Sequence, residues 1–175
     1  MTTTAIHDDS DKGRITRRKP KRIYASQTTT ISVSRDSEYA VVFSDPRAVK
    51  LITGSINERI LSIRKGLSGE MVKGVVSDKP VIRKMFIHGL QIDSSNASRL
   101  YRQKHLDEHQ SEVISDAFKI YNRACQVFET EKLANDWLQA DVPALRGRPI
   151  DLMDTAEGRR WVMDTLERIE TGDFS

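Results

Sequence analysis

The 175-residue sequence contains a single cysteine and no apolar run close to the roughly 20 residues that a membrane-spanning helix needs. One cysteine excludes an internal disulfide, and Cys125 lies on the apolar side of a helical pattern, so we expect a packed, reduced thiol. The N-terminus also lacks the apolar core of a signal peptide. We therefore expect a cytoplasmic protein.

Motifs that carry catalytic chemistry are also missing. The sequence has no glycine-rich phosphate loop, no G-x-S-x-G, no cysteine pair and no carboxylate pair with a reason to lie close together. "HLDEH" at 105–109 matches a zinc-protease pattern, but that chemistry needs both histidines on one helix. Asp107 is predicted to cap the helix, so His105 would precede it. We expect no metal, no cofactor and no enzymatic activity.

Charge is distributed unevenly along the chain. Residues 1–35 carry eight Lys and Arg against three Asp, and residues 59–104 carry ten against three acids. Residues 107–175 reverse the balance, with eight basic residues against fifteen acids. The middle of the chain can therefore bind phosphate groups, whereas the C-terminal part cannot do so favourably. This split indicates two separate functions.

The first 55 residues divide into two segments. Residues 1–30 include "KGRITRRKPKR", with seven basic residues in eleven, and are predicted to form a flexible basic arm. This arm is either a solvated tail or an extension that binds along nucleic-acid phosphates. Residues 31–55 form an extension of unknown role. Its β-branched and aromatic residues predict a short β element near 38–44. "PRAVKLITGS" fits either a helix or a strand.

From Ile56 onward the pattern is helical, so the fold class is predicted to be mainly α, a helical bundle. The helix that starts at Ile56 is expected to end at Gly66, and Ser68 is expected to cap a second helix through Val76. Asp78 is predicted to cap a third, with Pro80 in its first turn and Gly89 as its end. Its buried stripe would contain Val81, Ile82, Met85 and Phe86.

A short turn and a polar helix from Asp93 or Ser94 follow, which is the sequence form of a helix-turn-helix. Leu100, with Tyr101, would anchor this second helix to the core. We predict base contacts from Ser95, Asn96, Ser98 and Arg99. Phosphate contacts are predicted from Arg83, Lys84, Arg102 and Lys104. Any small helical bundle with a charged face would show a similar pattern.

The C-terminal part predicts a long central helix, a shorter one and a final helix, joined by an unusual loop. The helices are expected from Asp107 to about Glu129, over Glu131–Ala140, and from Thr155 to about Glu170. The loop "PALRGRPIDLM" has two prolines, which restrict it and favour a rigid surface over a tether. Trp137 and Trp161 are predicted to lie in the core.

This stretch resembles the C-terminal domain of the Xre/MbcA/ParS-type antitoxins, the partners of RES-domain toxins. The shared pattern is a helix end "A-x-x-WL", a loop "P-x-L-x-G-x-x-P-x-x-LL", a helix start "T-x-x-G" and a close "L-x-x-I-x-x-G". In this sequence the loop departs by one residue, with "GRP" where "GxTP" is usual, and Met153 replaces the second leucine. The resemblance covers residues 56–175 in order, strongly from 124 on.

The resemblance implies an antitoxin of a type II toxin–antitoxin system that covers the active site of an NAD-consuming toxin. It also implies that the protein represses its own operon by binding operator DNA. The protein would be a homodimer within a hetero-oligomer. On this basis residues 56–106 form an Xre-like helix-turn-helix domain and residues 107–175 a toxin-binding domain. The implied toxin contacts are Leu145, Arg146, Gly147, Arg148, Glu157, Arg160, Asp173 and Phe174.

The residues leave one alternative open. A transcriptional regulator with the same helix-turn-helix could use its C-terminal domain only to dimerise and have no toxin partner. It would bind DNA strongly, with marked salt sensitivity, and would form no stable complex with another protein.

Overall fold

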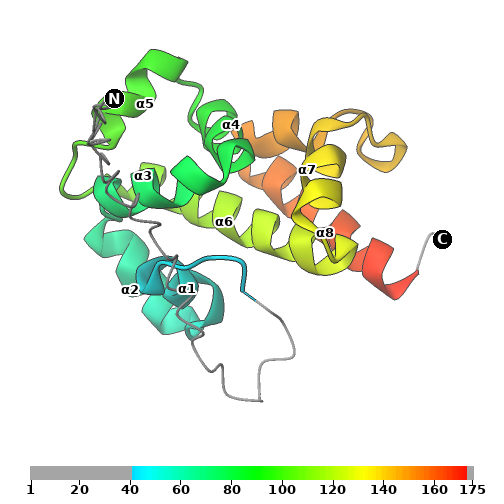
Figure 1. The fold of residues 1–175 in the computed structure, drawn as a ribbon, viewed down its shortest axis with the longest axis horizontal. Helices are drawn as coiled ribbons and strands as arrows, with labels where there is room; N and C mark the ends of the chain where they lie inside the picture. Colours follow the sequence, from blue (N-terminus) through cyan, green and yellow to red (C-terminus); the bar gives the residue numbers. More distant parts are fainter. Residues whose placement is uncertain (1–40, 173–175) are drawn as a thin grey trace, which may run out of the picture. The chain divides into compact units, whose positions relative to one another are not determined.

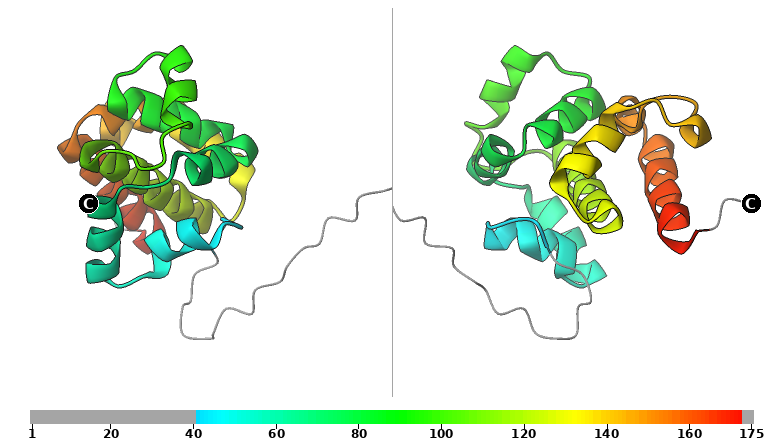
Figure 2. Two further views of the ribbon diagram at one scale, coloured as in Figure 1. Left: turned by 90° about the vertical axis from the view of Figure 1, so that its left-hand side faces the viewer. Right: turned by 45° about the vertical axis from the view of Figure 1, so that its right-hand side comes forward.

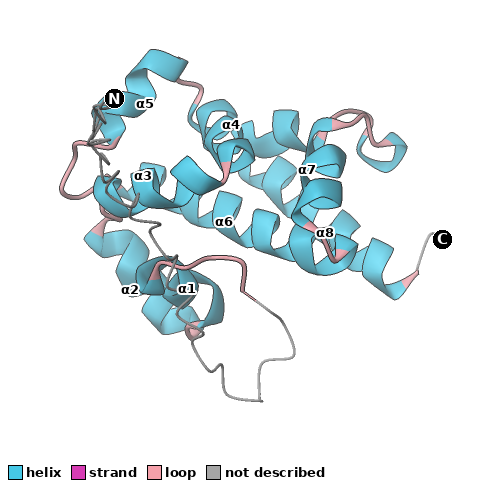
Figure 3. Cartoon of the chain, viewed as in Figure 1, coloured by secondary structure: helices cyan, strands magenta, loops and turns pink. Residues whose placement is uncertain are grey.

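The computed structural model describes residues 41–172, which are mainly helical and contain no strand (Figure 3). This confirms the predicted fold class. The elements in chain order are α1 (Pro46–Thr53), α2 (Ile56–Lys65), α3 (Gly69–Asp78), α4 (Pro80–Leu90), α5 (Ser94–Leu100), α6 (Glu108–Phe128), α7 (Glu131–Gln139), the 3₁₀ turns η1 (Pro143–Leu145) and η2 (Pro149–Asp154), and α8 (Ala156–Thr171). None of these helices is long and apolar enough to cross a membrane.

Helix α6 is the central element of the described residues (Figure 1). It packs against α1, α2, α4, α7 and α8, and its buried side chains recur at helical spacing. Val113, Ala117, Ile120, Tyr121 and Ala124 are all buried, as the apolar pattern predicts. Asp107 caps this helix in a reciprocal capping box with Gln110, which is also confirmed, and His105 lies before the helix begins.

The segment predicted to be a β element is different where the structure describes it. Residues 41–44 are irregular, and 38–40 lie outside the described residues. The Val42 N–H donates to the Oδ1 atom of Asn122 at 3.1 Å, so it bonds to a side chain of α6 and not to a neighbouring strand. Phe43 packs on Phe118, with ring centroids 5.2 Å apart. "PRAVKLIT" is a helix, α1, capped by Asp45.

Two helix ends in the middle of the chain were predicted wrongly. Asp78 does not cap α4, because α3 continues two residues past Val76 and uses Asp78 as its last residue. Pro80 opens α4 as expected, but Lys79 is the N-cap and makes no side-chain capping bond. Gly89 does not end α4, which continues to Leu90 and ends at Gln91 in the left-handed conformation.

Gly89 is instead the point where α4 comes closest to its neighbours. A Cβ atom on Gly89 would lie 2.5 Å from Cγ1 of Val113 on α6 and 3.0 Å from the carbonyl oxygen of Met153 on η2. Only a residue without a side chain fits between these two groups. Helix α4 therefore packs directly against η2, and this contact joins the segment predicted to be a helix-turn-helix to the C-terminal segment.

Candidate functional site

The loop between α7 and α8 projects beside α8 and is held by backbone hydrogen bonds (Figure 2, right). The Val142 N–H donates to the Gly147 carbonyl at 3.0 Å, which closes residues 142–147 into a small hairpin. Within it, the Leu145 N–H donates to the Val142 carbonyl at 2.9 Å, and the Leu145 side chain is buried. Leu145, which the resemblance implied as a toxin contact, has a buried side chain that anchors the loop to the core, and its neighbours Ala144 and Arg146 are exposed.

Arg146 occupies the tip of this loop. Its backbone has a φ of 53°, in the left-handed region, and its side chain is exposed. Within residues 41–172 the Arg146 side chain forms no hydrogen bond or ion pair. A non-glycine residue in this region is strained by about 1 kcal/mol or more, and such strain clusters at functional sites. The fold therefore presents an unpaired guanidinium on a fixed backbone.

The second loop arginine is engaged differently. Arg148 is exposed, and its guanidinium forms a two-pronged pair with Asp151, with Nε 2.7 Å from Oδ2 and Nη2 2.9 Å from Oδ1. This carboxylate raises the pKa of Arg148 above its ordinary value. Asp151 in turn lies 3.9 Å from Nδ1 of His88 on α4. Arg148 thus stiffens the turn into η2, and the loop offers Arg146 as its free cation.

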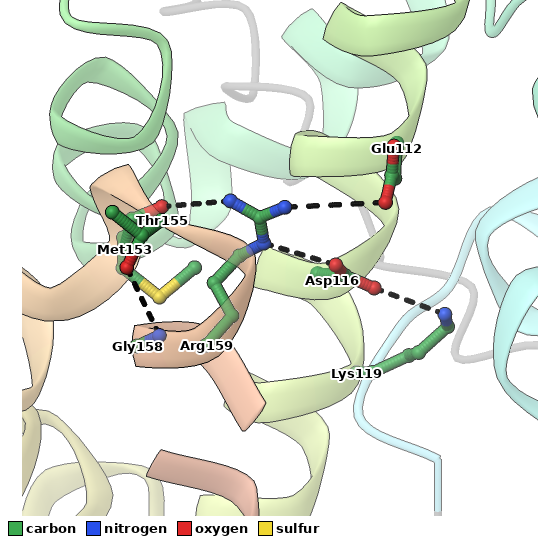
Figure 4. Close-up of polar contacts among 7 residues, drawn as sticks. All are labelled: Glu112, Asp116, Lys119, Met153, Thr155, Gly158 and Arg159. Carbon is green, nitrogen blue, oxygen red and sulfur yellow. Dashed lines mark hydrogen bonds and ion pairs between the residues drawn. The ribbon is translucent and has the colours of Figure 1, made fainter. Parts of the chain in front are cut away.

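Helix α8 is attached to α6 through a buried arginine that the sequence analysis missed (Figure 4). Arg159 is 5% exposed, and its Nε donates to Oδ2 of Asp116 at 3.0 Å. Its Nη1 donates to the Met153 carbonyl at 3.1 Å, which fixes the end of η2. The available signal was that Arg159 shares a helical face with Val162 and Leu166, both of which are buried.

The outer face of α8 is polar except for one aromatic residue. Glu157 and Arg160 are exposed, as predicted, and so is Trp161. The expectation that Trp161 lies in the core was wrong, because Val162, Thr165 and Leu166 fill the buried face of α8 and leave the indole outside. Trp137 is half-buried and packs on Phe128, with ring centroids 5.5 Å apart. Asp173 and Phe174 lie outside the described residues.

The predicted helix-turn-helix residues lie on α4, α5 and the segment after α5. Ala97 and Leu100 are buried and anchor α5, and the ring of Tyr101 meets Phe86 edge-on at 6.4 Å. The side chains predicted to face bases are all exposed on α5: Ser95, Asn96, Ser98 and Arg99. Arg102 and Lys104 are exposed just beyond that helix.

The two basic residues from α4 make contacts within the protein. Arg83 donates from Nη2 to both the carbonyl and the hydroxyl oxygen of Ser94, at 2.8 and 2.7 Å, and so fastens the start of α5. Lys84 donates to Oε1 of Gln139 on α7 at 2.7 Å. The two candidate surfaces, α5 and the loop after α7, lie at opposite ends of the described residues (Figures 1 and 2).

Comparison with known proteins defines the class of the C-terminal segment. Residues 123–172 match the family model of the antitoxin Xre/MbcA/ParS C-terminal toxin-binding domain. This range comprises the end of α6, both 3₁₀ turns, α7 and α8, and so includes the rigid loop and the outer face of α8.

A curated relative agrees with this match. The Prs ADP-ribosylating antitoxin of Sphingobium sp. (strain YBL2) is 26% identical over 129 residues, which are 67% of this chain and 81% of the relative. Together these findings confirm the predicted resemblance to the Xre/MbcA/ParS-type antitoxins, whose toxin-binding domain matches the C-terminal segment of this chain.

Proposed function

We propose that this antitoxin neutralises a RES-domain toxin that consumes NAD, and that it does so by binding over the toxin's active site. The observation that carries this proposal is Arg146, an exposed and unpaired cation on a fixed loop inside the toxin-binding domain. A preorganised arginine loses little entropy on binding and suits a carboxylate or the position of a phosphate. Arg148, Gly147, Glu157 and Arg160 would surround it, with Leu145 holding the loop from beneath.

The relative supports the class of toxin chemistry. Its name contains the term ADP-ribosylating, and an ADP-ribosyl group is transferred from NAD. An NAD-consuming partner is consistent with that chemistry. The antitoxin itself would act by binding and not by catalysis.

The decisive experiment is co-expression with the product of the adjacent gene, which we expect to be a RES-domain toxin, followed by pull-down and measurement of NAD consumption. Arg146→Glu is expected to weaken the complex by at least tenfold and to restore NAD loss. Reversing the charge at the loop tip removes the ion pair that Arg146 would form with the toxin. Lys73→Glu on α3 is the matched control, since it makes the same charge change at an exposed position outside residues 123–172. Equal binding by both variants would refute this role for the loop.

We further propose that α4 and α5 bind operator DNA and repress the antitoxin's own operon. Ser95, Asn96, Ser98 and Arg99 would meet base edges, and Arg102 and Lys104 would meet phosphates. Lys84 on α4 would add to the positive potential that attracts the phosphates, and Arg83 would hold α5 in place. The excess of basic residues in 59–104 supports this assignment.

The test is binding of the duplex upstream of the operon at several salt concentrations. Arg102→Ala should weaken binding to all sequences and lower the salt slope by about 1. Arg99→Ala should also reduce the preference for the operator over random DNA. Arg146→Glu is the control, because it should impair toxin binding and leave DNA binding unchanged. Failure of both DNA variants to alter binding would contradict the assignment.

A further inference from the structure

Two cations at the end of α2 are exposed and have no partner in the described part of the chain. Arg64 and Lys65 occupy the last turn of that helix. Within residues 41–172 neither side chain forms a hydrogen bond or an ion pair. Glu58, the only acid on α2, lies in its first turn, and its Oε1 is 3.0 Å from Nζ of Lys50 on α1. Nothing on α2 therefore neutralises its last turn.

The end of α2 is fastened to the segment that follows α5. The Leu106 N–H donates to the Leu67 carbonyl at 2.9 Å. The Gly69 N–H donates to the Gln103 carbonyl at 3.1 Å. A Cβ atom on Gly69 would lie 2.4 Å from the carbonyl oxygen of Leu100, the last residue of α5. The two segments therefore pack backbone against backbone.

The α2–α5 junction, which comprises residues 64–69 and 100–106, gathers four exposed cations. They are Arg64, Lys65, Arg102 and Lys104. Figure 1 shows the chain after α5 passing down the left side of the ribbon to the point where α2 is followed by α3. Neither Arg102 nor Lys104 forms an ion pair within the described residues. Like charges held together without partners favour a ligand of opposite charge.

The acids closest in sequence to this junction are compensated at helix ends. Glu70 lies in the first turn of α3, and Asp107 and Glu108 lie at the start of α6. The positive end of each helix dipole offsets these carboxylates. The Asp107 carboxylate also accepts from the Gln110 N–H at 2.8 Å. These acids therefore leave the cations of the junction largely uncompensated.

The cations of α4, by contrast, are engaged within the protein. Arg83 donates to Ser94 at the start of α5. Lys84 donates to Gln139 on α7. The start of α5 also carries Asp93, an exposed acid. The unpaired positive charge beside α5 therefore lies at its C-terminal end and not at its start.

We propose that Arg64 and Lys65 bind DNA phosphates beside the base pairs that α5 reads. The major groove of B-DNA is about 12 Å wide, so both ends of a helix within it lie close to phosphates of the flanking strands. The junction would place α2 on the strand that borders the C-terminal end of α5. Contacts of this kind set the register of a protein on the duplex but carry no sequence information. The inference rests on the operator binding proposed above, and it adds a contact from a helix that had no assigned role.

The experiment measures binding of the full chain to the duplex upstream of the operon at several salt concentrations. Arg64→Ala and Lys65→Ala should each lower the salt slope by about 1, and the double variant should lower it by about 2. The preference for this duplex over random DNA should not change, because phosphate contacts are common to both. Helical content and the unfolding midpoint should stay close to those of the wild type.

Arg168→Ala is the matched control. Arg168 is likewise an exposed cation in the last turn of a helix, α8, and it forms no ion pair within the described residues. Its removal costs the same kind of interaction with a helix end but should leave the salt slope unchanged.

Tethered cleavage locates the contact on the duplex. Lys65→Cys that carries an iron–EDTA group should cut the DNA backbone beside the protected base pairs. Arg168→Cys with the same group should not cut there. The buried Cys125 should remain unlabelled.

Three results would overturn the inference. They are an unchanged salt slope for the double variant, an equal loss of slope for Arg168→Ala, and no specific cut from Lys65→Cys. If Arg99→Ala still lowers the preference for the operator in these cases, the proposed DNA binding stands and only the contact through α2 is wrong. A wild type that binds no duplex would overturn both.

Discussion

Arg159 on α8 and Asp116 on α6 form a partly buried ion pair, with Nε 3.0 Å from Oδ2. The arginine is almost wholly enclosed, whereas the carboxylate is partly exposed and also accepts from Lys119 at 3.1 Å. Arg159 depends on Asp116 for its closest countercharge, because Glu112 is 4.0 Å from Nη2. The pair therefore fixes the α8 surface and η2 to the centre of the fold (Figure 4).

Asp116→Ala is expected to lower the free energy of unfolding by about 3 kcal/mol, because it leaves a buried guanidinium without its carboxylate. Arg159→Met should cost less, since it removes the buried charge and keeps much of the volume. Urea unfolding of both variants measures the difference. A larger loss for Arg159→Met would show that the bond to the Met153 carbonyl, and not the charge, is the stronger contribution.

Gly89→Ala is expected to lower the free energy of unfolding by about 1–3 kcal/mol, because its Cβ atom would clash with Val113 and approach the Met153 carbonyl. Gly74→Ala on α3 is the matched control. It has no atom within 4 Å of the added Cβ and should stabilise the protein by about 0.5–1 kcal/mol. Thermal unfolding of both variants is the measurement. Stabilisation by both would contradict the close contact between α4 and η2.

Stability is expected to fall as the pH rises above 9. Burial, together with the nearby charge of Glu131, raises the pKa of the Cys125 thiol from 9.0 to about 11. The unfolded chain therefore loses this proton first, so the stabilisation is complete below pH 9 and is lost as the pH rises toward 11. Burial also raises the pKa of the Tyr121 phenol above its ordinary value of 10.0.

Cys125→Ala separates the two groups in urea unfolding measured from pH 8 to 11. The variant should lack the decline between pH 9 and 10 and keep the decline above pH 10 that Tyr121 causes. Identical pH profiles for the variant and the wild type would mean that Cys125 does not contribute.

Trp161→Ala is expected to weaken toxin binding by about 2 kcal/mol, roughly 30-fold, with little change in stability. Exposed aromatic residues in the centre of an interface are common hot spots, and this indole lies on the same face of α8 as Glu157. Titration calorimetry with the purified toxin is the measurement. Leu133→Ala on α7 provides the comparison, and an equal loss there would argue against a special role for α8.

Local signals in the sequence predicted most helix ends and the buried stripes. Caps at Ser68, Asp107 and Thr155 are where the pattern put them, because capping depends on residues close in the chain. The roles of Asp78 and Gly89 were predicted wrongly because they depend on contacts with neighbouring helices and not on the local sequence. Asp78 is a plausible cap in sequence but became the last turn of α3, and Gly89 serves a contact with η2, which lies more than sixty residues later.

The candidate site divides in the same way. The sequence predicted exposed residues on the loop, α5 and the start of α8, because turn and amphipathic patterns are local. Their partners could not be predicted. Arg159 lies buried against Asp116, 43 residues earlier in the chain, and Lys84 donates to Gln139, 55 residues later. Trp161 was assigned to the core because hydrophobicity alone does not say which side of a helix is already full.

Helix α4 has one further consequence for regulation. It holds α5 through Arg83, meets η2 at Gly89 and contacts α7 through Lys84, so the two proposed surfaces share a single rigid support. If a ligand bound at one surface changes the binding affinity of the other surface, a single coupling free energy describes the effect in both directions. Whatever factor a bound toxin applies to the affinity for the operator, the operator must apply the same factor to the affinity for the toxin.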